Sequence, residues 1–363
     1  MKILYVGDLS SYARARQRFL AMQDLEYSVK GISSVPSEKE LDLTDRPSLW
    51  ERFRWKVGYP VDLVGVNQKM LEEAELYQPD LIWIDKGLMI HKSTLHSLRN
   101  ILPNLKLALW LPEYINSKQN RSVYFLQCLP LYDYIFSPMS QNCRSSWVSR
   151  KGIRSLNCVN QGYDKYLHYP VKVGKNEQNK FGSDVSFIGT FERSRARKML
   201  DLARAGITVR IWGNGWRKWL SKHPNLKIEN QPLFNKNYIK ALCASKINLC
   251  FLRKANQDRQ TSRSMEIPAC GAFMLAERTE EHQMLFEEGK EAEFFDIDDS
   301  EELCRKVFYY LENEEERKAI TKAARERCLK SGYSYHELLL QLLQQIMSDT
   351  QPRILDKNCT KLV

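Results

Sequence analysis

The chain has 363 residues, 43% hydrophobic and 27% charged, as is ordinary for a globular protein of two domains. Its net charge of +11 is compatible with an anionic partner, such as nucleic acid or a membrane surface, and also with an enzyme that handles a phosphorylated ligand. The absence of long basic runs favours the enzyme. Nine cysteines without a C-x-x-C pair indicate reduced thiols, and the scattered histidines exclude zinc spacing. No apolar run approaches a membrane span and no signal peptide is evident, so we expect a cytoplasmic protein.

Residues 1–165 alternate short apolar runs with helical stretches. We expect strands at 2–6, 81–84, 105–111, 134–136 and 155–159, and helices near 14–18, 93–100 and 141–150. Continuous apolar runs separated by helices are typical of parallel strands that are buried on both faces. These residues therefore predict a first α/β domain at 1–165.

The segment 166–182 carries Pro170 and several lysines with little apolar periodicity, so we predict a linker there. The alternation then restarts, with strands expected at 185–188, 208–212, 226–228, 247–252, 272–276 and 292–295. This pattern predicts a second α/β domain at 183–333. A leucine stripe predicts a helix at 334–350 that crosses back to the first domain, and 351–363 has the polar character of a tail.

The densest group of polar side chains follows the strand expected at 247–252. It occupies one loop and one helical turn and comprises Asp258, Arg259, Thr261, Ser262, Arg263 and Glu266. Loops at the strand ends of open α/β sheets bind ligands, and arginines beside a helix N-terminus suit phosphate oxygens. Glu266 alone would fit a plain helix start, and Asp258 alone a solvated loop, but neither explains the whole mixture. The segment predicts a clamp for a nucleoside diphosphate.

Two glycine turns of the second domain are further candidates. Gly189 and Thr190 follow the strand at 185–188, and Arg193 opens the next helix. Gly213 and Asn214 follow the strand at 208–212. Glycine lets the backbone approach a ligand closely, and a helix N-terminus favours an anion. An ordinary tight turn explains each of these features equally well.

Acidic residues elsewhere have competing interpretations. Asp296 and Asp298 form a D-x-D pattern that suits a divalent cation, but Asp299 opens an amphipathic helix, so we favour helix capping over a metal site. Asp85 and Glu113 follow apolar runs of the first domain. Either acid is a candidate catalytic base for an acceptor hydroxyl, or it pairs with a neighbouring lysine.

The tract at 238–303 resembles the group 1 glycosyltransferases, especially the branch like the spore maturation protein CgeB. The resemblance rests on the segments 258–266 and 269–273, with further matches at 187–192, 213–216 and 288–292. Residues 160–164 resemble the junction at which such chains cross to their second domain.

This resemblance implies a GT-B fold, in which two Rossmann-like, doubly wound α/β domains face one another across a cleft and C-terminal helices pack back across the join. It also implies that the second domain holds a nucleotide-sugar donor. Such enzymes often carry two acids separated by seven residues, the second of which binds the ribose. Asp258 and Glu266 have this spacing, with aspartate in place of the commoner glutamate.

By the same resemblance, arginines neutralise the donor diphosphate and a glycine turn approaches it through its backbone. The arginines are Arg263, Arg193 and Arg259, and the turn is that of Gly189 and Thr190. GT-B enzymes need no bound metal, so we expect neither a metal nor a cofactor besides the donor.

The leading hypothesis is a metal-independent glycosyltransferase that moves a sugar from a UDP- or GDP-sugar to an acceptor hydroxyl. The acceptor would be a glycan, a lipid-linked sugar, a protein or DNA. Arginines and a helix N-terminus would stabilise the departing nucleoside diphosphate. The alternatives are a viral enzyme that modifies DNA bases, a non-catalytic nucleotide-sugar-binding protein, and a metal-dependent GT-A enzyme that uses Asp296 and Asp298.

Overall fold

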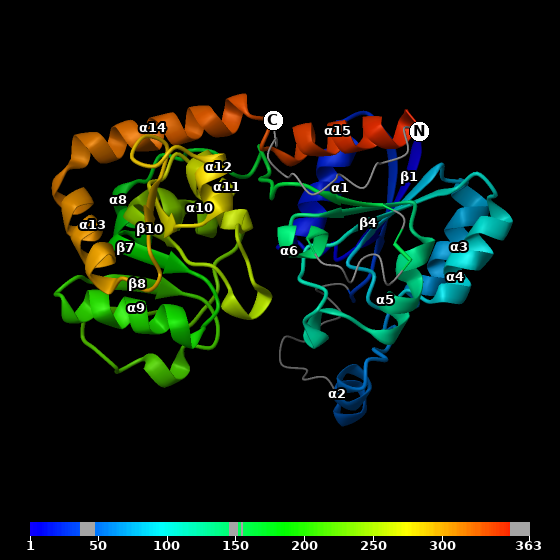
Figure 1. Ribbon diagram of the computed structural model, residues 1–363, viewed down its shortest axis with the longest axis horizontal. Coiled ribbons are helices and arrows are strands. Elements are labelled where there is room, and N and C mark those ends of the chain that lie inside the picture. The colour runs from blue at the N-terminus through cyan, green and yellow to red at the C-terminus, as the bar shows by residue number, and fades with distance from the viewer. Residues whose placement is uncertain (37–47, 145–151, 154, 349–363) are drawn as a thin grey trace. The chain divides into compact units, whose positions relative to one another are not determined.

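The computed structural model describes residues 1–36, 48–144, 152–153 and 155–348. Its contacts divide the chain into two compact units. Unit 1 comprises Met1–Asn160 and the chain from Tyr335 onward, and unit 2 comprises Gln161–Ser334. Each unit is a parallel six-stranded sheet flanked by helices, which confirms the expected pair of doubly wound α/β domains (Figure 1). The predicted tail at 351–363 lies outside the described residues.

The sheet of unit 1 has the strand order β2-β1-β3-β4-β5-β6, and all its pairings are parallel. The strands are β1 (Lys2–Gly7), β2 (Ser28–Ser33), β3 (Leu81–Asp85), β4 (Lys106–Trp110), β5 (Tyr134–Ser137) and β6 (Leu156–Cys158). The helices are α1 (Arg14–Asp24), α2 (Leu49–Lys56), α3 (Val66–Tyr77), α4 (Lys92–Ile101), α5 (Val123–Cys128), α6 (Ser140–Cys143) and α15 (Tyr335–Met347), with short 3-10 turns η1 (Lys118–Asn120) and η2 (Leu129–Leu131).

Both faces of this sheet are buried because successive side chains of each strand point to opposite faces. In β1, Leu4 packs in a core with the residues of α3 and α4, whereas Tyr5 packs in a core with α1 and α15. Helix α15 lies against α1, so the last described helix completes the core that the first strand begins (Figure 1).

The sheet of unit 2 has the strand order β12-β11-β10-β7-β8-β9, again with parallel pairing throughout. The strands are β7 (Ser183–Ile188), β8 (Val209–Trp212), β9 (Leu226–Ile228), β10 (Ser245–Cys250), β11 (Met274–Glu277) and β12 (Glu293–Phe295). The chain winds outward from β7 through β8 to β9, and then returns to the other side of β7 to form β10. The strand order therefore reverses between β7 and β10, which is where doubly wound sheets bind ligands.

The helices of unit 2 cover both faces of its sheet (Figure 1). They are α8 (Lys175–Phe181), α9 (Arg193–Arg204), α10 (Asn235–Ala244), α11 (Ser262–Ala269), α12 (Glu280–Leu285), α13 (Ser300–Glu312) and α14 (Glu314–Lys330), with 3-10 turns η3 (Arg217–Trp219) and η4 (Lys254–Asn256). The segment predicted as a linker, 166–182, contains α8, and its Phe181 is buried in the core of unit 2.

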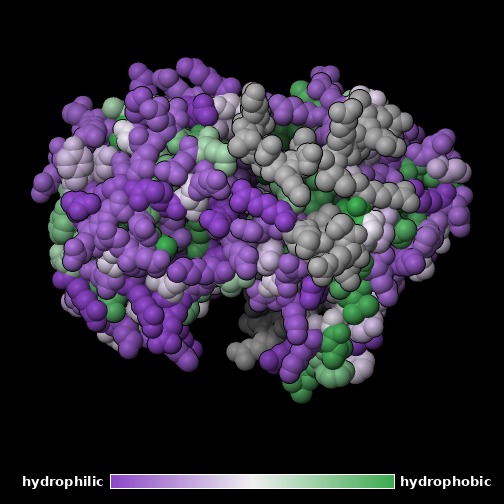
Figure 2. All heavy atoms as spheres, viewed as in Figure 1, coloured by the Kyte–Doolittle hydropathy of each residue, from purple (hydrophilic) through white to green (hydrophobic). Residues whose placement is uncertain are grey.

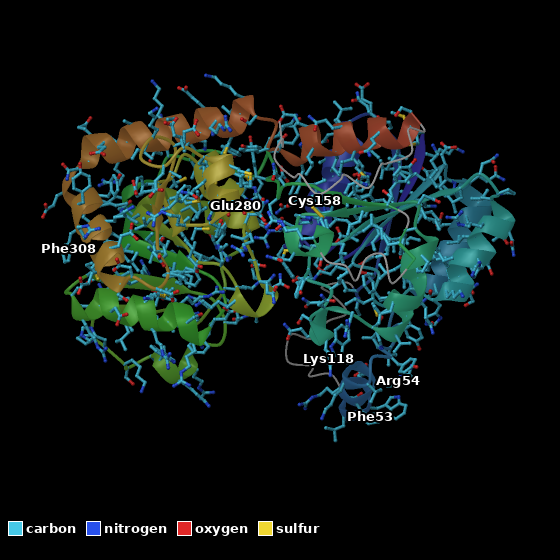
Figure 3. The ribbon with its side chains drawn as sticks, in the orientation of Figure 1. Phe53, Arg54, Lys118, Cys158, Glu280 and Phe308 are labelled. Atoms are coloured by element: carbon cyan, nitrogen blue, oxygen red, sulfur yellow. A yellow bond between two sulfur atoms is a disulfide. The ribbon has the colours of Figure 1, made fainter. Side chains whose placement is uncertain are left out.

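Two features bear on the compartment expected from the sequence. Cys143 and Cys158 form a disulfide between α6 and β6, so the expectation that the thiols are reduced is wrong for this pair (Figure 3). Among the described residues, no helix is both long and apolar enough to cross a bilayer.

Candidate functional site

The candidate site lies at the carboxyl ends of β7 and β10, the point where the strand order of unit 2 reverses. β7 continues into the turn at 189–192 and then α9, and β10 continues through η4 and the loop at 257–261 into α11. Because neighbouring parallel strands end at the same edge of a sheet, the glycine turn and the arginine-rich loop both follow strands that end at this edge.

Gly189 and Gly213 shape the turn after β7 because their backbones approach very closely. A Cβ on Gly213, whose φ is +138°, would lie 2.1 Å from the carbonyl oxygen of Gly189. The Gly189 amide donates to Trp212 O, and the Phe191 amide donates to Asn214 O. Gly213 and Asn214 thus hold the turn that carries Gly189, while Thr190 is exposed at its tip.

Two guanidinium groups lie near one aromatic ring at this edge. The guanidinium carbons of Arg195 in α9 and Arg263 in α11 lie 5.5 and 5.9 Å from the ring centre of Phe187. Arg195 is only 1% exposed. The Nε atoms of both arginines are buried and have no hydrogen-bond partner within the described chain. A buried donor without a partner costs free energy, which makes these two arginines candidates for contact with an anionic ligand.

Carboxylates offset part of this positive charge. Arg195 Nη2 lies 3.0 Å from a carboxylate oxygen of Glu192 and donates to Leu252 O. Burial and the charge of Arg263 lower the pKa of Arg195, whereas Glu192 and Glu277 act in the opposite direction. Glu277 ends β11, and its carboxylate accepts from the Leu252 amide. Burial raises the pKa of Glu277 to about 7, so this acid titrates near neutral pH beside the arginines.

A chain of hydrogen bonds fixes the first turn of α11, which carries Arg263. The Thr261 amide donates to Ser264 Oγ, which lies 2.7 Å from His282 Nε2. His282 Nδ1 lies 2.6 Å from the carbonyl oxygen of Glu277, which can only accept, so Nδ1 carries the proton and Nε2 accepts from Ser264. Burial lowers the pKa of His282 to about 4, so the ring is neutral at pH 7. This chain of hydrogen bonds therefore fixes the position of α11 relative to β11 and α12.

Asp258 and Glu266, the two acids of the predicted spacing, occupy different surroundings. Asp258 accepts from the amide and Nε of Arg253 and from Asn256 Nδ2, so it organises the loop after β10. Glu266 is 1% exposed, and its Oε2 accepts from Tyr238 OH at 2.8 Å. Neither geometry tests the ribose contact, which stays a prediction.

The other predicted residues of this region lie around the arginine pair. Arg193 and Arg259 are exposed, and the Arg259 carbonyl accepts from Thr279 Oγ1. Ser262 is buried and donates to Gln161 Oε1. Far from this loop in the sequence, Asp299 caps α13 by accepting from the Glu302 amide, as the capping interpretation requires.

The two base candidates lie at the strand ends of unit 1. Asp85 is buried, and its Oδ2 accepts from Tyr5 OH and from Arg18 Nε and Nη2 at 3.0, 2.9 and 2.5 Å. Glu113 is partly exposed and lies 3.5 Å from Lys86 Nζ. Glu113 thus has the neighbouring lysine that the structural interpretation named, whereas Asp85 pairs with the distant Arg18, and Glu113 is the more accessible of the two.

Three charged residues of the site, Arg195, Glu192 and Glu277, were not predicted from the sequence. Arg195 shares one helical face with the buried Met199 and Leu202, a placement that is unusual for an arginine and could have drawn notice. Glu277 directly follows an apolar strand, the same signal by which Asp85 and Glu113 were found.

The family model described as "Glycosyl transferase-like" matches residues 193–344, which include both arginines. No curated protein sequence matches the chain. Among solved structures, HepE of Anabaena in complex with UDP and glucose is 13% identical, with 96% of this chain and 100% of that chain covered and a TM-score of 0.62. Sucrose-phosphate synthase of Thermosynechococcus elongatus is 13% identical, with 96% and 98% covered and a TM-score of 0.66.

An α-glucosyltransferase in complex with UDP and a 13-mer DNA is 12% identical, with 96% of this chain and 99% of that chain covered and a TM-score of 0.66. These similarities show that the chain has the GT-B fold of two Rossmann-like units.

Proposed function

We propose that this protein is a glycosyltransferase that binds a nucleotide-diphosphate sugar at the carboxyl ends of β7 and β10 and transfers the sugar to an acceptor hydroxyl. The proposal includes membership of the CgeB-like branch of the group 1 enzymes. The match of residues 193–344 to the glycosyltransferase-like family and the UDP complex of a protein with the same fold support this activity.

One observation carries the proposal. Arg195 and Arg263 present buried, unpartnered guanidinium nitrogens beside the same ring, at the reversal of strand order. The two like charges repel each other, and a diphosphate with oxygens facing both guanidinium groups would offset that repulsion. The same positive charge would stabilise the nucleoside diphosphate as it leaves the sugar.

The first test measures the diphosphate contact directly. Titration calorimetry ranks UDP, GDP and ADP, and the preferred diphosphate and its nucleoside are then titrated into variants. Arg263→Ala should weaken the diphosphate by about 10- to 100-fold, because a charge-assisted hydrogen bond is lost, and should leave the nucleoside unchanged. Arg195→Lys, which keeps the charge but loses the planar fork, should act in the same direction.

The matched control is Arg204→Ala, which removes an exposed arginine from the other end of α9. It should bind the diphosphate as the wild type does. Unchanged diphosphate affinity in both Arg263→Ala and Arg195→Lys would refute the site. Mass spectrometry of a nucleotide-sugar panel then separates a transferase, which hydrolyses its donor slowly without an acceptor, from a protein that only binds it.

The proposal assigns the neutralising charge to arginines instead of a metal ion. Transfer and donor hydrolysis should therefore persist in EDTA. Activity that is lost in EDTA and restored by Mg²⁺ or Mn²⁺ would instead favour a metal-dependent enzyme.

DNA is a second candidate acceptor because of the charge distribution in unit 2. Between residues 190 and 222 the chain has nine Lys and Arg against two Asp and Glu, so this stretch supplies +7 of the net +11. Exposed members include Arg193 and Arg197 on α9 and Lys218 and Lys222 after β8. Binding to duplex DNA that weakens steeply with salt, followed by sugar transfer to a base, would support this acceptor.

A further inference from the structure

Helix α2 of unit 1 exposes large apolar side chains. None of its residues is buried, although its sequence contains two tryptophans, a leucine and a phenylalanine. Leu49, Trp50 and Phe53 are 82, 62 and 54% exposed, and Val57 at the end of the helix is also exposed. Figure 2 shows apolar side chains gathered at the end of unit 1 where Figure 1 places this helix. Scattered exposed apolar residues are normal, but a cluster marks an interaction surface.

Four of the exposed apolar residues form one stripe with basic borders, while Trp55, which is 50% exposed, lies on the opposite face of the helix. At about 100° per residue, Leu49, Phe53, Val57 and Trp50 fall within an arc of about 100°. The rings of Trp50 and Phe53 stack with their centres 5.9 Å apart. Arg52 and Lys56 border the stripe on one side and Arg54 on the other, so the helix is both amphipathic and basic.

The helix is fixed in place by contacts that leave this stripe facing solvent. Ser48 and Glu51 form a capping box at its start. At its end, Arg54 donates to the carbonyl oxygen of Tyr59 and to the hydroxyl of Tyr124 in α5. Figure 3 shows Phe53 and Arg54 on this helix, at the same end of unit 1 as the exposed Lys118 of η1. The stripe is therefore presented outward by an anchored helix.

We propose that α2 docks the protein on an anionic lipid membrane by lying in the plane of the interface. Tryptophan and phenylalanine enter the boundary between head groups and acyl chains, while flanking arginine and lysine contact anionic head groups. Duplex DNA would engage the cations but leave the apolar stripe in water. A second copy of this helix would bring its own Arg52 and Lys56 against the same cations. This surface is independent of the donor site in unit 2.

The test is cosedimentation of the full chain with phosphatidylglycerol-rich vesicles and with neutral phosphatidylcholine vesicles. The wild type should bind the anionic vesicles more tightly. Arg52→Glu with Lys56→Glu should weaken that binding at least about 25-fold, since each basic side chain near an anionic surface contributes about fivefold. Trp50→Ala with Phe53→Ala should weaken it at least about tenfold.

Leu76→Ala and Phe308→Ala are matched controls because they remove exposed apolar side chains from α3 and α13. Both should bind vesicles as the wild type does, and all variants should keep the wild-type melting temperature. Equal binding by wild type and α2 variants would overturn the proposal. Two other results would also overturn it. A wild-type dimer that the α2 variants lose would indicate self-association through α2. Duplex DNA binding that the α2 variants lose, in a wild type that does not bind vesicles, would indicate a nucleic-acid surface.

Discussion

Two buried titratable side chains of unit 2, Glu277 and His282, respond to pH in opposite directions. Burial raises the pKa of Glu277 from 4.5 to about 7. Between these two pH values the native protein keeps the Glu277 proton, whereas the unfolded chain has lost it. The contribution of Glu277 to stability is therefore present at low pH and is lost by about pH 7. Burial lowers the pKa of His282 from 6.5 to about 4, so its contribution is present above 6.5 and is lost as pH falls towards 4.

We predict that Glu277→Gln leaves His282 as the main source of pH dependence in the unfolding free energy. In the wild type the two slopes oppose each other between pH 4.5 and 6.5. In the variant only the histidine slope remains, so the unfolding free energy should rise with pH across this window, by up to about 3 kcal/mol. Urea unfolding at several pH values between about 4.5 and 7.5 measures this difference.

The exposed Glu312→Gln serves as the control and should give the wild-type profile. Parallel profiles for wild type and Glu277→Gln would show that Glu277 does not titrate in this window.

At the scale of single residues, the sequence predicted where the candidate site lies better than which charged side chains surround it. Arg263 was found because its loop concentrates polar residues after an apolar strand. Arg195 was not predicted because its place beside Arg263 depends on α9 turning it inward against Phe187, which only tertiary packing reveals. Asp258 contacts its own loop in the described chain, and the ligand contact expected of it stays a prediction.

The turn after β7 depends on a close approach between two backbones. We predict that Gly213→Ala destabilises the protein by at least about 2 kcal/mol, because its φ of +138° is strained for alanine and the new Cβ would overlap Gly189 O. The displaced turn should also weaken diphosphate binding. Urea unfolding and calorimetry measure the two effects.

Gly206→Ala is the control that separates backbone strain at a positive φ from the steric overlap expected in Gly213→Ala. Gly206 also has a positive φ, +93°, but a Cβ added there would meet no atom within 4 Å beyond its chain neighbours in the described residues. We expect a cost of about 1 kcal/mol from strain alone and unchanged diphosphate affinity. Equal effects of the two substitutions would contradict the role given to the contact between the turns.

At the scale of elements, the buried strands were predictable and the exposed elements were not. β3 and most of β4 appear as continuous apolar runs because both faces are covered. β2 lies at the sheet edge and buries only Ile32, so its sequence lacks such a run and no strand was expected there. α2 was missed for a related reason, since it buries no side chain that would set a helical period against a core.

The first and last parts of the described chain share one core in unit 1. Leu339 and Leu343 of α15 are fully buried with Tyr5 of β1. We predict that Leu339→Ala and Leu343→Ala each cost about 2–5 kcal/mol and speed hydrogen exchange in β1 and β3 but not in β7 and β10. Exchange detected by mass spectrometry locates the effect.

Gln341→Ala, on the exposed side of the same helix, should leave exchange unchanged. Faster exchange in unit 2 for the leucine variants would show that the two units do not unfold separately.

The assignment of α15 to unit 1 has a consequence for synthesis on the ribosome. All 174 residues of unit 2 leave the exit tunnel before the helix that covers the Tyr5 side of the first sheet. Unit 2 has its whole sequence available while the Tyr5 face of the nascent first sheet is covered by α1 but still lacks α15. The strands of the first sheet are therefore translated before unit 2 but are fully buried only after it. Their apolar side chains on the Tyr5 face are the surface that a chaperone would bind in the meantime.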